Sequence, residues 1–247
     1  MGGLKHRVQD YNKAGARLQA GLLFLATVAL LVPSVISQAD ATAGAAVLPH
    51  LSVGLSVLLI VTYALGMLFS LKTHRELFAA AEGGEAGEAP WPIGLSLATL
   101  AGVTVLVALV SEVFVASVQK AAETFGMTPA FVGFIVVALV GGAAEMASAF
   151  SGARKNRLDL SVGIALGSAS QIALFVAPVL VLVSYAIGPA PMDLQFWPGA
   201  VVMVLIATMT ASLVANSGRS TWFHGALVIA VYLTFAITLF MLPPRNQ

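Results

Sequence analysis

Two acidic residues, Glu112 and Glu145, lie inside apolar stretches of this 247-residue sequence and are the side chains best placed to do chemistry. Glu145 lies in the run FVGFIVVALVGGAAEMASAF, which is long enough to cross a bilayer. A carboxylate at that depth costs several kcal/mol unless a neighbouring group compensates it. Gly141 and Gly142 precede Glu145, so the backbone beside the acid is thinly covered. An acid next to exposed backbone oxygens indicates a cation site in a membrane protein.

A cluster of polar side chains is expected at the depth of Glu145. The apolar runs on either side of the sequence RKNRLD predict a helical hairpin, and Glu145 lies nine residues before this turn. Ser168 lies nine residues after it, so both residues should be about 13–14 Å from the turn, near the middle of the bilayer. Ser170 and Gln171 add polar groups at nearly the same level.

The expected ligands are all oxygen atoms, which is the preference of hard cations such as Ca²⁺. Soft metals favour Cys or His, and the sequence contains no Cys. A carboxylate can hold either a proton or a metal ion, which is the chemical minimum for exchange. The predicted metal ligands are Glu145, Gly141, Gly142 and Ser168, and the predicted proton-coupling and ion-path residues are Glu112, Gln171 and Ser170.

Each of these residues also has a purely structural interpretation. A glutamate inside a span can serve as a hydrogen-bond partner between helices, and this alternative is stronger for Glu112 than for Glu145. The Gly163–Gly167 pair has the spacing that usually serves close helix packing. Gln171 can simply bridge two helices.

The elements that position these residues are predicted to be membrane-spanning helices. The sequence is 59% hydrophobic and 9% charged, with a mean hydropathy of +0.94, which indicates an all-α, polytopic membrane protein. A net charge of +1 argues against a nucleic-acid partner. No Ser–His, HExxH or paired-Asp motif lies within the apolar runs, so no enzyme activity is expected. The seven predicted spans are Leu18–Ile36, Val47–Leu71, Trp91–Gln119, Pro129–Gly152, Leu160–Ile187, Gln195–Val214 and Trp222–Leu242.

The distribution of basic residues predicts the orientation of these spans. With the N-terminus in the cytoplasm and the C-terminus outside, only Lys120 and Arg245 of the 12 basic residues lie outside. The expected location is the inner membrane of a bacterium. Residues 72–90 are acidic and rich in glycine, and they are read as a cytoplasmic linker between residues 1–71 and 91–247.

The first two spans resemble the last two. Leu25–Thr27 reads LAT and Ile206–Thr208 reads IAT, while Ile60–Leu65 reads IVTYAL and Tyr232–Ile237 reads YLTFAI. The matched spans would run in opposite directions, as in transporters built from inverted repeats. Residues 91–247 would then form a complete five-helix repeat, and residues 1–71 would be the tail of an incomplete one. Chance similarity between apolar helices is the alternative.

Four short motifs resemble the second alpha repeat of calcium/proton exchangers, members of the calcium/cation antiporter superfamily. They are GGAAEM at residues 141–146, KNRLDL at 155–160, GIALGS at 163–168 and QIALFV at 171–176. The similarity is specific over residues 135–182, and it extends more loosely along the chain, including YNKA at residues 11–14. The resemblance implies a calcium ligand at Glu145, site-shaping roles for Ser168 and Gln171, and an ion-path role for Glu112.

The sequence departs from the family pattern at two positions and over one region. Gly142 replaces the usual Asn, and Met146 replaces a frequent His, which removes a titratable group beside the site. The resemblance also implies a first alpha repeat with a second acid, and we expect this sequence to lack that repeat.

The expected function is therefore Ca²⁺/H⁺ antiport by alternating access, with Ca²⁺ as cargo and no prosthetic group. The expected partners are Ca²⁺, H⁺ and the lipid bilayer, with a missing N-terminal half or further copies of the chain as candidate protein partners. The alternative is a non-transporting membrane subunit that assembles with a separate chain.

Overall fold

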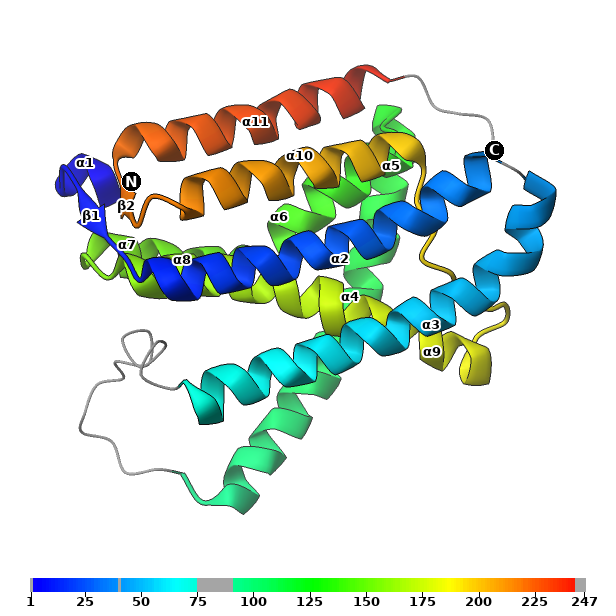
Figure 1. Ribbon diagram of the computed structural model, residues 1–247, viewed down its shortest axis with the longest axis horizontal. Coiled ribbons are helices and arrows are strands. Elements are labelled where there is room, and N and C mark those ends of the chain that lie inside the picture. Colours follow the sequence, from blue (N-terminus) through cyan, green and yellow to red (C-terminus); the bar gives the residue numbers. More distant parts are fainter. Residues whose placement is uncertain (1, 40, 75–90, 243–247) are drawn as a thin grey trace. The chain divides into compact units, whose positions relative to one another are not determined.

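The computed structural model describes residues 2–39, 41–74 and 91–242, and most of these residues are helical (Figure 1). Among them, six helices are long and apolar enough to cross a membrane, and one broken helix pair is a seventh candidate. The two-residue strands β1 (Gln9–Asp10) and β2 (Arg219–Ser220) pair in antiparallel register. The prediction of an all-α membrane bundle with about seven spans is confirmed.

The helices agree with the predicted spans to within a few residues at most ends. They are α1 (Gly2–Lys5), α2 (Lys13–Ala39), α3 (Ala41–Leu68), α4 (Ile93–Phe125), α7 (Ala143–Arg154), α8 (Leu158–Gln171), α9 (Ala177–Ile187), α10 (Pro198–Ala215) and α11 (Trp222–Met241). Helix α4 continues past Lys120 and ends at Phe125, because Gly126, with a φ of 63°, stops the helix. Lys120 therefore lies within a helix rather than in a loop.

Within the residues that the structure describes, three π-helical segments interrupt or extend these helices. They are η1 (Phe69–Thr73), η3 (Val132–Val137) and η4 (Ile172–Val176). Segment η3 lies between the short helices α5 (Pro129–Phe131) and α6 (Ala138–Gly141). Segment η4 ends two residues before Pro178, which cannot donate a backbone hydrogen bond, so a wider turn accommodates the proline within a continuous span.

The chain forms two compact units. The first combines residues 1–82 with 144–232, and the second combines residues 83–143 with 233–247. The division predicted from the sequence, into residues 1–71, 72–90 and 91–247, follows internal repeats rather than packing and stays a prediction. Residues 75–90 of the predicted linker lie outside the described residues.

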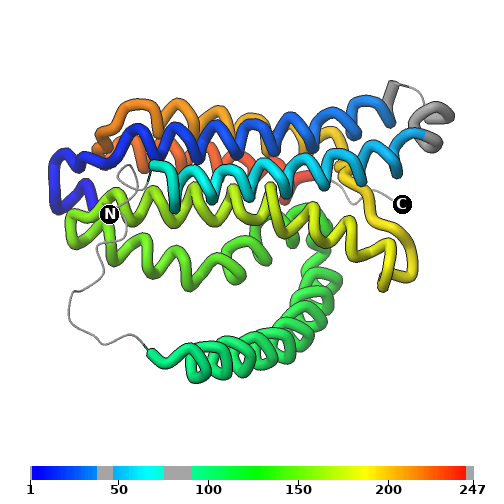
Figure 2. The backbone as a smooth tube through the Cα atoms, turned by 60° about the horizontal axis from the view of Figure 1, so that its bottom comes forward, coloured from blue at the N-terminus to red at the C-terminus, as the bar shows by residue number. Residues whose placement is uncertain are grey.

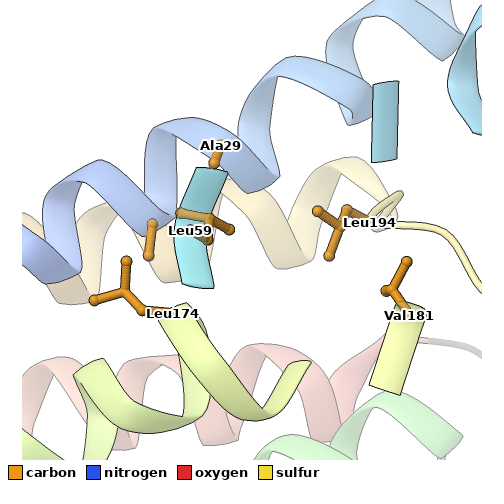
Figure 3. Packing of buried hydrophobic residues seen from close by; sticks show 6 residues of the cluster. Ala29, Leu59, Leu174, Val181 and Leu194 are labelled. Carbon is orange, nitrogen blue, oxygen red and sulfur yellow. The ribbon is translucent and has the colours of Figure 1, made fainter. Parts of the chain in front are cut away.

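The core of the first unit lies between helices α2, α3 and α9, with η4 beside them. Helices α2, α3 and the continuous α8–α9 span run side by side (Figure 2). Leu59 and Leu174 are fully buried where these helices meet, and Val181 and Leu194 continue the same cluster (Figure 3). Ala26 and Ala29 complete this cluster and keep the helices close.

The second unit contains α4, α5, η3, α6 and the end of α11. The Thr128 hydroxyl caps α5 by accepting from the Phe131 amide, and it also donates to the Leu239 carbonyl at 3.2 Å. Phe131 packs edge-on against Phe240, and Leu239 is fully buried. These contacts hold the start of the broken span against the end of α11.

Candidate cation site

Glu145 lies in the first turn of helix α7, directly after a break in its span. Helix α6 ends at Gly141, and Gly142 has φ −87° and ψ 5°, outside the range of a regular α-helix. A Cβ atom at Gly142 would lie 3.1 Å from the Ala138 carbonyl oxygen, so glycine fits the break best. The end of α6 leaves carbonyl groups without helical partners, and the start of α7 favours a negative side chain.

Helices α7 and α8 bring Glu145 and Ser168 into direct contact. The Ser168 hydroxyl donates a hydrogen bond of 2.8 Å to the Glu145 Oε1 atom. Glu145 is exposed and Ser168 is partly buried. The prediction that these two residues lie at the same level is confirmed, while their role as metal ligands stays a prediction.

The turn between α7 and α8 sets the register of this pair. The Arg157 amide donates to the Gly152 carbonyl at 2.8 Å, and Asn156 has φ 59°, a left-handed conformation that asparagine tolerates well. The side-chain amide of Gln9 donates to the Ala153 carbonyl at 2.8 Å and to the Asn156 Oδ1 atom at 3.0 Å. The turn is therefore fixed both by its own backbone and by a buried residue from the segment before α2.

Ser170 faces a different helix from Ser168. Two residues correspond to about 200° around an α-helix, so the two side chains leave α8 in nearly opposite directions. The Ser170 hydroxyl is buried and donates to the Gln19 carbonyl of α2 at 3.2 Å. A Cβ atom at Gly167 would lie 3.7 Å from the Gln19 Nε2 atom, whereas one at Gly163 would meet nothing within 4 Å. Of these two glycines, only Gly167 lies beside another helix.

The remaining predicted site residues are Gln171, Glu112, Gly141 and Gly142. Gln171 is exposed and is the last residue of α8. Glu112 is exposed within α4 and belongs to the second unit, whereas Glu145 and Ser168 belong to the first. Gly141 and Gly142 also belong to the second unit, at its end. The ion-path role of Glu112 and Gln171 stays a prediction.

The contact between Glu145 and Ser168 brings together few of the oxygen atoms that a Ca²⁺ ion needs. Within residues 2–39, 41–74 and 91–242, no three His, Cys, Asp or Glu side chains gather as a metal centre. A Ca²⁺ ion takes about six to eight oxygen ligands. Glu145 offers two oxygens and Ser168 one, so backbone carbonyl groups, water or other acids must supply the rest.

The contacts that hold the segment before α2 against α8 and α10 were not predicted from the sequence. The Asn12 backbone amide donates to the Asp159 carboxylate, and the Asn12 side chain accepts from the amides of Ala14 and Gly15 at the start of α2. The Tyr11 hydroxyl donates to the Val214 carbonyl at 2.8 Å. An asparagine directly before an apolar run is a helix N-cap signal, and it could have identified Asn12.

Comparison with known proteins identifies similar sequences and structures. Residues 95–241 match the family described as sodium/calcium exchanger protein. The Ca²⁺/H⁺ antiporter of Synechocystis sp. is 38% identical, and the Ca²⁺/H⁺ antiporter ChaA of Bacillus subtilis is 40% identical. Each match covers 98% of this chain and 69% of the relative. The solved structure of native YfkE superimposes with a TM-score of 0.76 at 36% identity, covering 98% of this chain and 68% of that one.

Proposed function

Because the chain belongs to the sodium/calcium exchanger protein family, we propose that it exchanges Ca²⁺ for protons by alternating access. The contact between Glu145 and Ser168 carries this proposal, because it joins a carboxylate and a hydroxyl within two apolar helices of the matched region. The relatives are named as transporters, which fits the expectation that the chain is not an enzyme. Ca²⁺ is then a substrate rather than a resident cofactor.

In the proposed cycle, Glu145 in its charged form binds Ca²⁺ through its carboxylate oxygens. The Ser168 hydroxyl, which donates to the carboxylate in this structure, rotates to offer its oxygen to the ion. The carbonyl groups of Gly141 and Gly142 lie at the end of a helix, where the backbone dipoles favour a cation. The negative end of one half-helix and an acid in the next are typical of ion sites in discontinuous spans.

Release of the ion requires that a proton replaces it. A proton on Glu145 removes the charge that holds Ca²⁺, and the hydroxyl of Ser168 again satisfies the carboxyl group. Glu112 is proposed to relay this proton along the ion path, with Ser170 and Gln171 shaping the protein around it. A divalent cation opposite one carboxylate leaves an excess positive charge, so a second acid near the bound ion is part of the proposal.

The chain is an integral membrane protein, and we place it in the inner membrane of a bacterium with its N-terminus inside. The pairing of β1 with β2, and the contacts of Gln9 and Asn12 with the α7–α8 turn, bring several basic residues to one end of the first unit. They lie on segments that the sequence placed on the cytoplasmic side: Lys13, Arg17, Arg154, Lys155, Arg157 and Arg219. Their shared position supports this orientation.

Transport by the purified chain in lipid vesicles tests the proposed function. A vesicle with an acidic interior should accumulate Ca²⁺, measured as ⁴⁵Ca uptake that collapses when a protonophore removes the pH gradient. Glu145→Gln keeps the size and the hydrogen-bonding shape of the side chain but removes its charge, so uptake should fall to background. Glu123→Gln removes an exposed acid from the end of α4 and should leave uptake unchanged.

Two outcomes would contradict the proposal in different ways. Normal uptake by the Glu145→Gln variant would show that this carboxylate does not carry the ion. If the unsubstituted chain shows no proton-driven uptake, then antiport by this chain alone is wrong, and the alternative of a non-transporting subunit that assembles with a separate chain is supported.

A further inference from the structure

Helices α2 and α10 enclose a groove on the first unit, remote in sequence from the Glu145–Ser168 contact. Its volume is about 420 Å³. Small residues leave the space: Ala20 and Gly21 from α2 and Ser212 from α10. A Cβ atom at Gly21 would meet no atom within 4 Å, so the groove is open along this side of α2. The two helices lie side by side in both views of the backbone (Figures 1 and 2).

The groove is polar at one end and apolar along the rest of its length. Arg17 and Asn216 line the polar end, and Asn216 directly follows the last residue of α10. Phe24 lies about two turns further along the same face of α2, and Leu213 lines the groove from α10. Phe24 is 46% exposed and Leu213 is 75% exposed, so both offer apolar surface to an occupant.

One basic side chain, Arg17, lines this polar end, and a second, Lys13, lies nearby on the same helix. Lys13 lies one turn before Arg17, and the carbon atoms of its side chain pack against Gly218, beyond the end of α10. Among the described residues, neither Lys13 nor Arg17 has an ion-pair partner, whereas Arg219 pairs with Asp10 at 2.9 Å. One cation and an amide donor therefore line the polar end of the groove, and Lys13 lies one helical turn from Arg17.

We propose that this groove binds an anionic glycerophospholipid. The phosphate group lies against Arg17, with Lys13 and the Asn216 amide beside it, and one acyl chain follows the groove past Gly21 between Phe24 and Leu213. A guanidinium group suits a phosphate because it can donate two parallel hydrogen bonds. The position of the charges, at the end where the basic residues of the first unit gather, is where anionic headgroups attract them.

The charge of the groove favours a lipid over a second copy of the chain. A symmetric dimer that buried this face would place Arg17 and Lys13 of one copy next to the same residues of the other, which is unfavourable. A zwitterionic headgroup carries an ammonium group that the same cations repel. The inference does not depend on the transported ion, because no residue of the groove belongs to the proposed cation site.

Native mass spectrometry of the purified full chain, with equal amounts of phosphatidylglycerol and phosphatidylcholine, tests the proposal. The unsubstituted chain should retain phosphatidylglycerol in preference. Arg17→Gln should lower this preference about fivefold, the effect expected for one basic residue at an anionic surface, and Arg17→Lys should restore most of it. Arg7→Gln removes an equally exposed charge outside the groove and should change nothing.

A second variant separates the lipid from other occupants. Gly21→Leu fills the groove without removing a charge, and it should reduce retained phosphatidylglycerol at least as strongly as Arg17→Gln. Equal retention of both lipids by the unsubstituted chain would overturn the proposal. The proposal would also be overturned if inorganic phosphate stabilised the chain as strongly as the lipid does. It would be overturned as well if Gly21→Leu dissociated an oligomer of the chain while the variant still retained phosphatidylglycerol.

Discussion

The hydroxyl groups of Thr27 and Thr208 lie 2.9 Å apart, buried between α2 and α10. Thr27 donates its own hydrogen to the Leu23 carbonyl at 2.9 Å, so Thr208 must be the donor between the two threonines. These residues occupy the same position in the matched segments LAT and IAT. Equivalent residues close to a twofold axis contact each other, so this pair supports the proposed inverted repeat.

Removal of one threonine from this pair should cost more stability than removal of both. Thr27→Val leaves the Thr208 hydroxyl buried without its acceptor, at a cost of about 1 kcal/mol, as for other hydrogen bonds between membrane helices. Thr27→Val combined with Thr208→Val should recover part of this loss. Unfolding in mixed micelles with increasing SDS measures the stability of the unsubstituted chain, the two single variants and the double variant. If the losses of the two single variants add up to the loss of the double variant, the two hydroxyl groups do not interact.

Ser168→Ala should weaken Ca²⁺ binding by about tenfold, the lower range for loss of a group that holds a metal ligand in place. The change removes both the hydrogen bond to Glu145 and one candidate oxygen ligand. The Ca²⁺ concentration at half-maximal uptake measures the effect. Ser161→Ala alters the same helix two turns nearer to the α7–α8 turn and serves as the matched control. If the two variants behave alike, then Ser168 has no special role.

Gly142→Ala should slow transport by favouring a continuous helix where the span now breaks. Alanine is more stable than glycine in a helix by about 1 kcal/mol, and its Cβ atom would press on the Ala138 carbonyl in the present conformation. Gly133→Ala is the control, because a Cβ atom there meets nothing within 4 Å. Initial rates of ⁴⁵Ca uptake are compared for Gly142→Ala and Gly133→Ala at equal amounts of folded protein. Equal rates for the two variants would show that transport does not need the break at Gly142.

Gln9→Ala should lower the free energy of unfolding by about 1 kcal/mol, because the Ala153 carbonyl loses its side-chain donor and keeps only a bond of 3.3 Å from the Asn156 amide. Gln9 is 3% exposed and binds two residues of the α7–α8 turn. Gln195→Ala removes an exposed glutamine that bonds to Ser37, and it should cost much less. Thermal unfolding followed by circular dichroism compares the variants. A smaller loss for Gln9→Ala than for Gln195→Ala would contradict a fastening role for Gln9.

Residue spacing predicted the depth of the site but only part of its geometry. Counting residues from the α7–α8 turn was enough to place Glu145 and Ser168 at one level, because helical rise is nearly constant. The same count placed Ser170 at this level, but rise says nothing about direction, and Ser170 turns toward α2. The angle of about 100° between successive helical residues would have separated the two serines from sequence alone.

Other features depend on contacts that no local pattern encodes. Gly141 and Gly142 predicted thinly covered backbone beside Glu145, but the sequence could not specify that the helix breaks at Gly142. The contacts of Gln9 and Tyr11 join segments that lie far apart in the chain, and neither residue has a spacing that predicts its partner. Segment η4 could have been suspected from Pro178, whereas nothing in the run VGFIVV indicates a π-helix at η3.

The fastening of the segment Gln9–Asn12 has a consequence for how the protein is made. Its partners are about 150 to 210 residues away, as in the pairs Gln9–Ala153 and Asp10–Arg219. Ribosomes deliver helices to the membrane in chain order, so α2 must enter the bilayer long before two of its neighbours, α8 and α10, are made. Contacts of such large sequence separation form late. We therefore expect an intermediate in which α2 is already inserted in the bilayer but has not yet packed against α10. The pairing of β1 with β2 then completes the assembly.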